Sequence, residues 1–285
     1  MKTEINSICT YMIMLFLIVS CASEDTIGST QLDTKTPVLS TLDKYIRSSY
    51  IGPYNIDVLY KWNENVVDYN RFLFPPTEQQ VQPVLEVVKK IWIDAYSEVA
   101  GADFVKLVAP RELLLVGGRN FNPSGTVLLG LAEGGKRITL FETDLVDLKN
   151  RGNITRFIST IQHEYCHILN QEKPFDEQGF GRITPSEYTA QWANTRTRDA
   201  RELGFISNYA RNNVVEDFAE MVSAMLTNSN EEYNAIIDGV DNEQARVDIR
   251  AKEAIVVDYF DKQWNIDFYE LQAVTARNTQ EFLNN

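Results

Sequence analysis

The pentapeptide at positions 163–167 constrains this chain more than any other feature, because it holds the only two histidines in the sequence. It reads His163-Glu164-Tyr165-Cys166-His167, the HExxH pattern. Positions four apart on a helix lie one above the other, so both imidazoles can bind one metal ion. The other face is apolar at helical spacing, with Ile154, Phe157, Ile158, Ile161, Tyr165, Ile168 and Leu169. The pattern predicts an amphipathic helix over residues 153–171 with a metal site on its polar face.

Glu164 follows the first histidine and is turned away from the line that joins the two imidazoles. From there its carboxylate can take a proton from a water molecule at the metal and then pass it to a leaving amine. Zinc at this site would lower the pKa of the water and polarise a carbonyl group. The pattern therefore predicts metal-dependent hydrolysis with Glu164 as the general base. Cys166 points to the flank of the helix and is expected to be buried.

Two histidines leave a catalytic zinc site one protein ligand short. The third ligand is therefore expected to be a carboxylate farther along the chain, since the sequence has no other histidine. The candidates are Glu172, Asp176, Glu177, Glu187, Asp199, Glu202, Glu216, Asp217 and Glu220. Those over 172–177 follow the histidines too closely to fold back easily. Those at 187, 199 and 202 are assigned to a charged helix, for which solvation is the simpler explanation.

The pair Glu216 and Glu220 lies on an otherwise apolar helix predicted over residues 213–227. Like charges four positions apart on a helix repel each other. A cation bound by one carboxylate, with the other holding a ligand histidine, would remove that repulsion. This pair is the favoured source of the third ligand, and Asp176, Glu177 and Glu187 stay open as alternatives.

Composition excludes several classes of protein. Hydrophobic residues make up 44% of the 285 residues, which is enough for one substantial core and excludes a disordered, fibrous or multi-span membrane protein. Lys and Arg number 27 against 40 Asp and Glu, and the net charge of −13 argues against nucleic-acid binding. Three scattered cysteines are too few for a disulfide framework.

The first 20 residues are typical of an export signal. An apolar run over 11–19 follows Lys2 and is shorter than the roughly 20 residues that a membrane span needs. The tetrapeptide Ile-Val-Ser-Cys at 18–21 resembles the lipobox of bacterial lipoproteins, in which the cysteine, here Cys21, carries the lipid. Residues 22–25, Ala-Ser-Glu-Asp, resemble a surface-export signal of some Gram-negative lipoproteins.

These features predict a lipoprotein signal peptide over 1–20 and a lipid-anchored flexible tether over 21–42, rich in Ser, Thr, Asp and Lys. We expect an outer-membrane lipoprotein that is held by its acyl chains and displayed at the cell surface. A single domain over 43–285 is expected to follow.

Hydropathy patterns predict an α+β fold with a mixed strand and helix first half and a helical second half. Alternation over 56–60 predicts a strand, and helical spacing predicts a helix from Thr77 to about residue 100. Further strands are expected over 104–108 and 113–116. The segments 126–131 and 137–142 flank Glu133-Gly134-Gly135 and predict a hairpin. From residue 153 onward the chain is expected to be mostly helical, with an irregular stretch over 173–185.

The residues after the HExxH helix resemble those of a known group of peptidases. Tyr209-Ala210, followed by Glu-Asp-Phe-Ala-Glu at 216–220, resembles the signature of the anthrax-lethal-factor-like gluzincin peptidases. More closely, the chain resembles the substrate import-associated zinc metallohydrolase lipoproteins, whose genes lie beside outer-membrane glycan or nutrient import systems. The resemblance covers most of the chain after the signal peptide.

The resemblance implies roles for individual residues. It implies that one zinc ion is bound by His163, His167 and Glu216. It also implies that Glu164 is catalytic, that Glu220 supports a ligand histidine and that Tyr209 aids the oxyanion. From the sequence alone, Tyr209 has the alternative of simple packing at the wall of the cleft.

We therefore expect a gluzincin-like zinc metallopeptidase that acts on a peptide or protein substrate. An outer-membrane import complex is an expected partner, together with the lipid membrane through the acyl anchor. The alternative is a zinc-containing binding or processing accessory of a nutrient or glycan import system with little peptidase activity. A degenerate scaffold is disfavoured by the intact Glu164, because a structural zinc site needs no base.

Overall fold

The computed structural model describes residues 38–284 except 66 and 69, and of the two units into which the chain divides the second, Leu39–Asn285, is compact. The predicted signal peptide over 1–20, Cys21 and most of the tether over 21–42 lie outside the described residues. The last two residues of the predicted tether belong to helix α2 (Thr41–Ile46), which has Ser40 as its cap. Leu42 in this helix is already buried.

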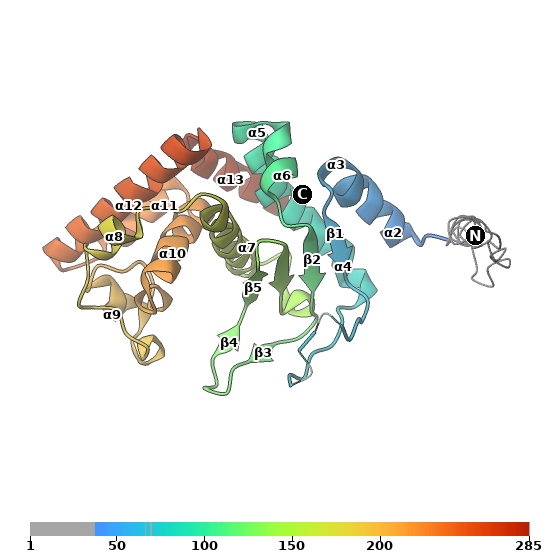
Figure 1. Ribbon diagram of the computed structural model, residues 1–285, viewed down its shortest axis with the longest axis horizontal. Helices are drawn as coiled ribbons and strands as arrows, with labels where there is room; N and C mark the ends of the chain where they lie inside the picture. The colour runs from blue at the N-terminus through green and yellow to red at the C-terminus, as the bar shows by residue number, and fades with distance from the viewer. Residues whose placement is uncertain (1–37, 66, 69, 285) are drawn as a thin grey trace, which may run out of the picture. The chain divides into compact units, whose positions relative to one another are not determined.

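The second unit has an α+β fold, as the sequence predicts, and its described strands all lie in the first half (Figure 1). After α2 come a π-helical turn (Arg47–Ile51), α3 (Gly52–Tyr54) and the short strand β1 (Asp57–Leu59). The helix predicted from Thr77 to about residue 100 is continuous. It consists of α4 (Glu78–Val88), a π-helical turn (Lys89–Ile93) and α5 (Asp94–Ala100).

The strand predicted over 104–108 is wrong, because these residues belong to helix α6 (Ala102–Val108). A short apolar run cannot by itself distinguish a strand from a helix. Exposure settles the matter here, since Val105 is fully buried whereas Leu107 is 78% exposed. In a strand these two residues would share one face. Gly101, at φ +92°, separates this helix from α5.

The main sheet has four strands in the order β1-β2-β6-β5. Strands β1, β2 (Glu112–Leu115) and β6 (Arg137–Leu140) are parallel, and β5 (Gly130–Glu133) runs antiparallel to β6 at one edge. The predicted hairpin is formed by β5 and β6. Gly134 and Gly135 in its loop adopt positive φ, a conformation that glycine reaches without steric cost.

The first arm of the predicted hairpin is shorter than expected. Residues 126–129 do not continue β5; instead β4 (Val127–Leu128) pairs with β3 (Asn120–Phe121) in a separate two-stranded sheet. One residue, Leu129, separates β4 from β5. The β3–β4 hairpin lies at one side of helix α7 (Arg151–Glu172).

The second half is helical, with α7 followed by α8 (Glu177–Gly181), α9 (Thr197–Arg201), α10 (Val214–Thr227), α11 (Asn230–Asp238), α12 (Glu243–Trp264) and α13 (Phe268–Leu283). The charged helix expected to hold residues 187, 199 and 202 is much shorter than predicted. It is the five-residue helix α9, which contains Asp199 and is capped by Glu202. One hydrophobic core joins α4, α5, α7, α10, α12 and α13 to the sheet. Among the described residues, no helix is long and apolar enough to cross a membrane.

Candidate metal centre

Helix α7 begins at a strong cap and packs its apolar face against the α4–α5 helix. The side chain of Asn150 accepts a hydrogen bond from the Asn153 N–H, which satisfies an otherwise unpaired donor of the first turn. In the next turns Tyr165 makes edge-to-face contacts with Trp92 and Tyr96, with ring centroids 5.0 and 5.1 Å apart. Burial of this apolar face fixes the direction in which the opposite, polar face points.

The polar face of α7 is largely covered around His163, because α10 and the edge strand β5 lie against it. His163 is only 7% exposed and Glu164 only 8%. Ser159 and Ser223 join the two helices through hydroxyl groups 2.6 Å apart. The HExxH residues therefore lie in a polar layer between two helices and a strand, where each group needs a partner.

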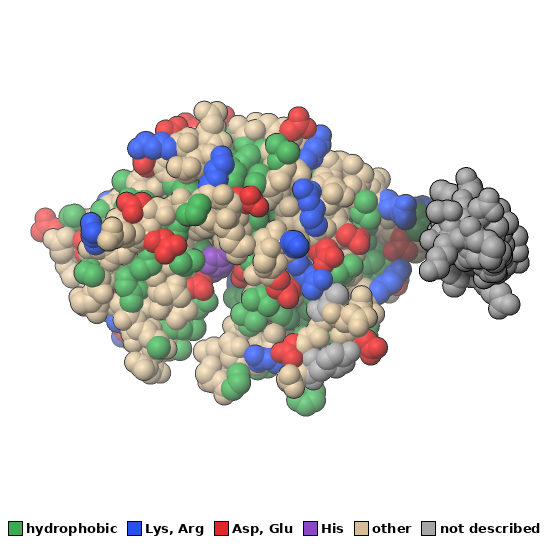
Figure 2. All heavy atoms as spheres, viewed as in Figure 1, with side chains coloured by type: hydrophobic (Ala, Val, Ile, Leu, Met, Phe, Trp, Pro, Cys, Tyr) green, Lys and Arg blue, Asp and Glu red, His purple; other side chains and the backbone are tan. Residues whose placement is uncertain are grey.

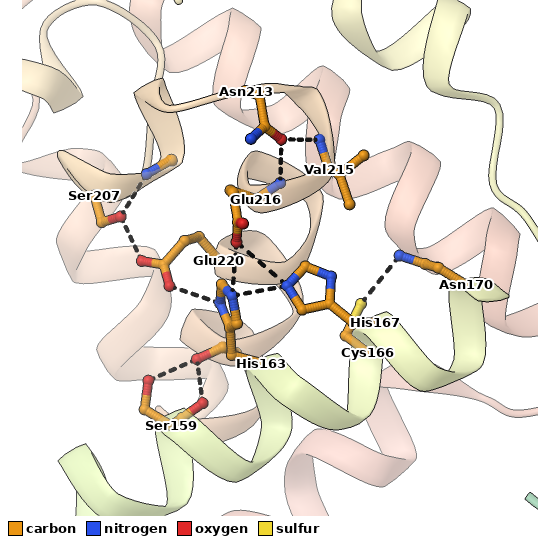
Figure 3. Close-up of polar contacts among 12 residues, drawn as sticks. Ser159, His163, Cys166, His167, Asn170, Ser207, Asn213, Val215, Glu216 and Glu220 are labelled. Atoms are coloured by element: carbon orange, nitrogen blue, oxygen red, sulfur yellow. Dashed lines mark hydrogen bonds and ion pairs between the residues drawn. The ribbon is translucent and has the colours of Figure 1, made fainter. Parts of the chain in front are cut away.

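Three potential ligand atoms converge in this layer (Figure 3). The Nε2 atoms of His163 and His167 are 3.0 Å apart, and they lie 2.9 and 3.2 Å from Oε2 of Glu216. Two bonds of about 2.0–2.1 Å at a tetrahedral zinc ion hold their ligand atoms about 3.3 Å apart. The three side chains thus have the spacing of ligands to one small cation. Cys166, on the same helix, is buried away from them.

Helix α10 supplies the third potential ligand atom from its first turn. Asn213 caps this helix by accepting hydrogen bonds from the Val215 and Glu216 N–H groups, 2.9 and 3.0 Å long. The cap fixes the start of the helix and hence the direction of the Glu216 side chain toward α7. Burial raises the pKa of Glu216, but hydrogen bonds to His163 and His167 outweigh it and hold that pKa well below the usual range.

Glu220 lies one turn after Glu216 and approaches His163 from its other ring nitrogen. Its Oε1 is 2.9 Å from Nδ1 of His163, so the ring is held between two carboxylates (Figure 3). The second oxygen of Glu220 accepts a hydrogen bond from the Ser207 hydroxyl. The oxygen of that hydroxyl accepts a hydrogen bond from the Ala210 N–H. A carboxylate at Nδ1 fixes the tautomer and orientation of a histidine whose Nε2 binds metal.

The carboxylates make this layer attractive to positive charge. Burial lowers the pKa of His163, but its bonds to Glu216 and Glu220 outweigh burial and raise it to about 10. Burial also raises the pKa of Glu164, against the opposing effect of the two histidines. A divalent cation would satisfy the same carboxylates. The donor set of two imidazoles and one carboxylate is one that catalytic zinc uses.

The edge strand holds Glu164 on the side away from α10. Gly130 of β5 lies so close that an added Cβ would come within 2.9 Å of Glu164 Cγ and 2.5 Å of Thr160 Cγ2. The backbone of Ala132, on the same strand, favours the charged form of Glu164 and so opposes the rise of its pKa. Sequence reasoning missed Gly130. A single glycine within a strand pattern is the signal that marks such a close approach.

Tyr209 lies at the opposite wall, in a short 3-10 turn (Tyr209–Arg211). Its ring is 5.8 Å from the ring of His163 and 4.8 Å, edge to face, from that of Trp192. Burial, followed by the charge of Glu216, raises the pKa of its phenol, which therefore stays protonated and able to donate. Ser207 and Trp192 carry no periodic pattern and were not singled out from the sequence.

These groups line a cleft of about 360 Å³ between the β3–β4 hairpin and the helical half. Histidine side chains are visible at the floor of a hollow on the face shown in Figure 2. The lining residues are Asn122, Thr126, Val127, Leu128, Leu129, Gly130, Arg156, Ser159, Thr160, His163, Glu164, Trp192, Tyr209 and Glu220. Glu164 is one of the lining residues, so the cleft gives access to its side chain.

The remaining carboxylates considered as third ligands are placed elsewhere. Asp176 caps α8, and Glu202 accepts the backbone N–H groups of Asp241 and Asn242. Glu187 lies 3.7 Å from Arg211, and Asp199 pairs with Arg196. Of the described residues, the group that could hold a metal ion is His163, His167 and Glu216.

Asp217 has a different role, which the sequence did not indicate. It is fully buried and pairs with the equally buried Lys252 of α12, with Nζ 2.7 Å from Oδ2. The same oxygen accepts the Tyr188 hydroxyl at 2.9 Å, and Lys252 also donates to the carbonyl oxygen of Gly204. Burial raises the pKa of Asp217 and lowers that of Lys252. The pair fastens α10, beside Glu216, to α12 and to the segment that leads to Tyr209.

Two comparisons place the chain among known proteins. Residues 35–269 match the model of a family described as "Putative zinc-binding metallo-peptidase". A crystal structure of "a putative zinc-binding metallo-peptidase" from Bacteroides caccae is 31% identical, with a TM-score of 0.71 over 86% of this chain and 93% of that chain. No curated protein matches the chain. Since the family model covers most of the sequence, the chain belongs to the family described as "Putative zinc-binding metallo-peptidase".

Proposed function

We propose that the protein is a zinc-dependent peptidase in which His163, His167 and Glu216 bind one zinc ion. The observation that carries the proposal is the convergence of their three ligand atoms, all within 4.8 Å of one another, beside Glu164. Zinc held there would supply Lewis acidity toward a water molecule and toward the scissile carbonyl. Glu220 and Ser207 would keep His163 in the tautomer that leaves Nε2 free to bind.

Glu164 acts as the general base and then as the acid. Its carboxylate faces the cleft, fixed by the backbone of β5 on one side and by the helix on the other. It takes a proton from the attacking water and delivers it to the leaving amine. Tyr209, across the cleft, donates its phenolic hydrogen to the oxygen that becomes negative in the tetrahedral intermediate.

The cleft favours an extended peptide as substrate. Strand β5 forms an edge of the main sheet and contributes Gly130 to the cleft wall. An extended peptide can add to a strand edge through main-chain hydrogen bonds, which recognise any sequence. The apolar side chains of Val127, Leu128 and Leu129 on one wall, and Trp192 on the other, provide contacts for its side chains.

Cleavage of a quenched peptide library tests this function. The purified zinc-loaded protein should hydrolyse members of the library, and dialysis against a chelator should abolish cleavage until zinc is returned. Stoichiometric zinc without cleavage of any peptide would instead support the alternative, a zinc-containing accessory of an import system that binds but does not hydrolyse. The presence of Glu164 beside the ligand set favours hydrolysis, because binding alone gives that buried carboxylate no function.

We also propose that the enzyme is an outer-membrane lipoprotein, displayed outward and working beside an import complex. The support is the sequence at 18–25 and the resemblance to import-associated lipoproteins. Acyl chains on Cys21 would supply the membrane affinity. Cys21→Ala should move the protein from the membrane fraction to the soluble fraction or leave it unprocessed. If the Cys21→Ala variant partitions into detergent as the wild type does, the lipid anchor is refuted and the peptidase proposal is unaffected.

A further inference from the structure

Arg156, at the wall of the cleft, shares the carboxylate of Glu142 with a second arginine, Arg119. Arg156 lies on α7, two turns before His163, and lines the cleft together with Thr160. Its Nη1 is 2.5 Å from Oε2 of Glu142. The other oxygen of Glu142 accepts the Nε–H of Arg119 at 2.7 Å. Two positive groups against one negative group leave a local charge of +1.

The carboxylate in this cluster is enclosed, whereas the two guanidinium groups are accessible. The Glu142 side chain is 5% exposed, and those of Arg119 and Arg156 are 53% and 52% exposed. Among the described residues, Glu142 is the one side chain that accepts a hydrogen bond from Arg156, and it uses a single Nη. A guanidinium has five N–H donors in a fixed plane, so most donors of Arg156 remain available at the cleft.

Arg119 already gives Glu142 a cation at 2.7 Å. Glu142 therefore has a cation besides Arg156, and the second guanidinium leaves the cluster with an excess positive charge. Arg156 lies on the same face of α7 as the histidines, at the wall of the cleft.

We propose that Arg156 is a binding site for a carboxylate group of the peptide substrate, a specificity that rests on the proposed peptidase function. Seven residues of helix separate Arg156 from His163, which is about 10 Å along the axis. An extended peptide advances about 3.3 Å per residue. The recognised carboxylate therefore lies about three residues from the scissile bond. It belongs either to an Asp or Glu side chain or to a free C-terminus.

The net charge of the protein does not oppose this preference. The chain carries −13 overall, but at physiological ionic strength exposed charges are largely screened beyond about 8 Å. A carboxylate that reaches Arg156 therefore responds mainly to the local cluster. Arginine binds carboxylate with two parallel hydrogen bonds, which also fixes the register of the peptide in the cleft.

Matched peptides test the proposal. One cleavable sequence is made with Glu, Gln or Lys in turn at each position two to four residues from the scissile bond on either side. A second set compares a free C-terminal acid with its amide. We expect one position, or the free acid, to raise kcat/KM about five- to thirtyfold over the neutral peptide, the range of an accessible charge-assisted bond. The set that responds identifies the source of the carboxylate.

Three variants assign the effect to one side chain. Arg156→Gln should bring the Glu and Gln peptides to equal kcat/KM, and Arg156→Glu should favour the Lys peptide. Arg198→Gln on α9 is the matched control, because this arginine is exposed and lies outside the cleft lining, and it should leave the preference intact. Equal cleavage of Glu, Gln and Lys peptides by the wild type, or a preference that survives Arg156→Gln, would refute the carboxylate site.

Binding to the inactive protein separates this proposal from the peptidase function. Fluorescence anisotropy with the zinc-loaded Glu164→Gln variant should show tighter binding of the carboxylate peptide than of its neutral match, and addition of Arg156→Gln should remove the difference. If the wild type cleaves nothing but this difference is seen, the carboxylate site stands and the peptidase proposal fails. If peptides are cleaved but the carboxylate and neutral peptides bind equally, the peptidase proposal stands and the carboxylate site fails.

Discussion

Around His163 the two faces of helix α7 are both largely buried, but by different means. On one face Tyr165 contacts Trp92 and Tyr96. The stabilisation there comes from apolar surface removed from water, and many apolar side chains could provide it. On the other face His163 contacts Glu216 and Glu220 from α10. A buried polar group is tolerated only when its own partners are in place. One face thus provides stability and the other holds the proposed site, and substitutions should separate the two.

The largest effect is expected for the carboxylate on the polar face. Glu164→Gln keeps the shape of the side chain but removes the proton acceptor, so kcat should fall about a thousandfold. Zinc content, measured by mass spectrometry, should stay near one ion per chain. Wild-type turnover in this variant would remove Glu164 from the mechanism and leave the polar face with a metal-binding role alone.

The next effect compares the two carboxylates of α10. Glu216→Ala removes a proposed ligand and should lower zinc affinity by more than a hundredfold, whereas Glu220→Ala removes a group that orients His163 and should lower it about 10–100-fold. Competition with a mild chelator measures both. The reverse order would show that Glu220 is the ligand, although its oxygen lies beside Nδ1 of His163 and not beside the convergent Nε2 atoms.

The apolar face should respond in stability and not in chemistry. Ile161 is fully buried, and Ile161→Ala should lower the free energy of unfolding by about 2–4 kcal/mol. At a temperature where the variant is folded, kcat and zinc content should equal those of the wild type. Val247→Ala is the matched control, because Val247 is 55% exposed and should cost less than about 0.5 kcal/mol. A loss of kcat in folded Ile161→Ala would show that the two faces are coupled.

The smallest effect is expected where the edge strand meets the polar face. Gly130→Ala would place a methyl group against Thr160 and Glu164, so it should lower kcat about tenfold by displacing the base, with zinc retained. Thr160→Ser removes the Cγ2 atom that lies nearest, so it should restore part of the loss. Gly239→Ala, where an added Cβ meets no atom closer than 3.3 Å, is the control. An unchanged kcat would show that the strand adapts without moving Glu164.

The sequence predicted the parts of the fold that depend on regular spacing. The helical pattern of Ile154, Phe157 and Ile161 predicted α7, and the hairpin followed from the two glycines at 134 and 135. The prediction of a strand over 104–108 is wrong because a run of five mostly apolar residues is compatible with both a strand and a helix. The burial of Val105 and the exposure of Leu107 distinguish the two. Such short elements are set by tertiary contacts.

The same limit applies to the site. The sequence points to Glu216 and Glu220 because like charges four positions apart on a helix repel each other unless a cation lies between them. The structure brings both carboxylates to His163. Ser207 and Trp192 lie in the irregular segment between α8 and α10, where no periodic pattern places a side chain. Their positions depend on long-range contacts such as the buried pair of Asp217 and Lys252.

The split of the proposed ligand set between two helices has a consequence for the whole chain. His167 and Glu216 are 49 positions apart, so an ion held by both would act as a cross-link that closes the intervening loop. An ion that binds only the native chain shifts the folding equilibrium toward it by mass action. Loss of the ion should therefore loosen first the stretch between the helices, which carries Ser207 and Tyr209. Metal starvation would make this stretch the first target of proteases.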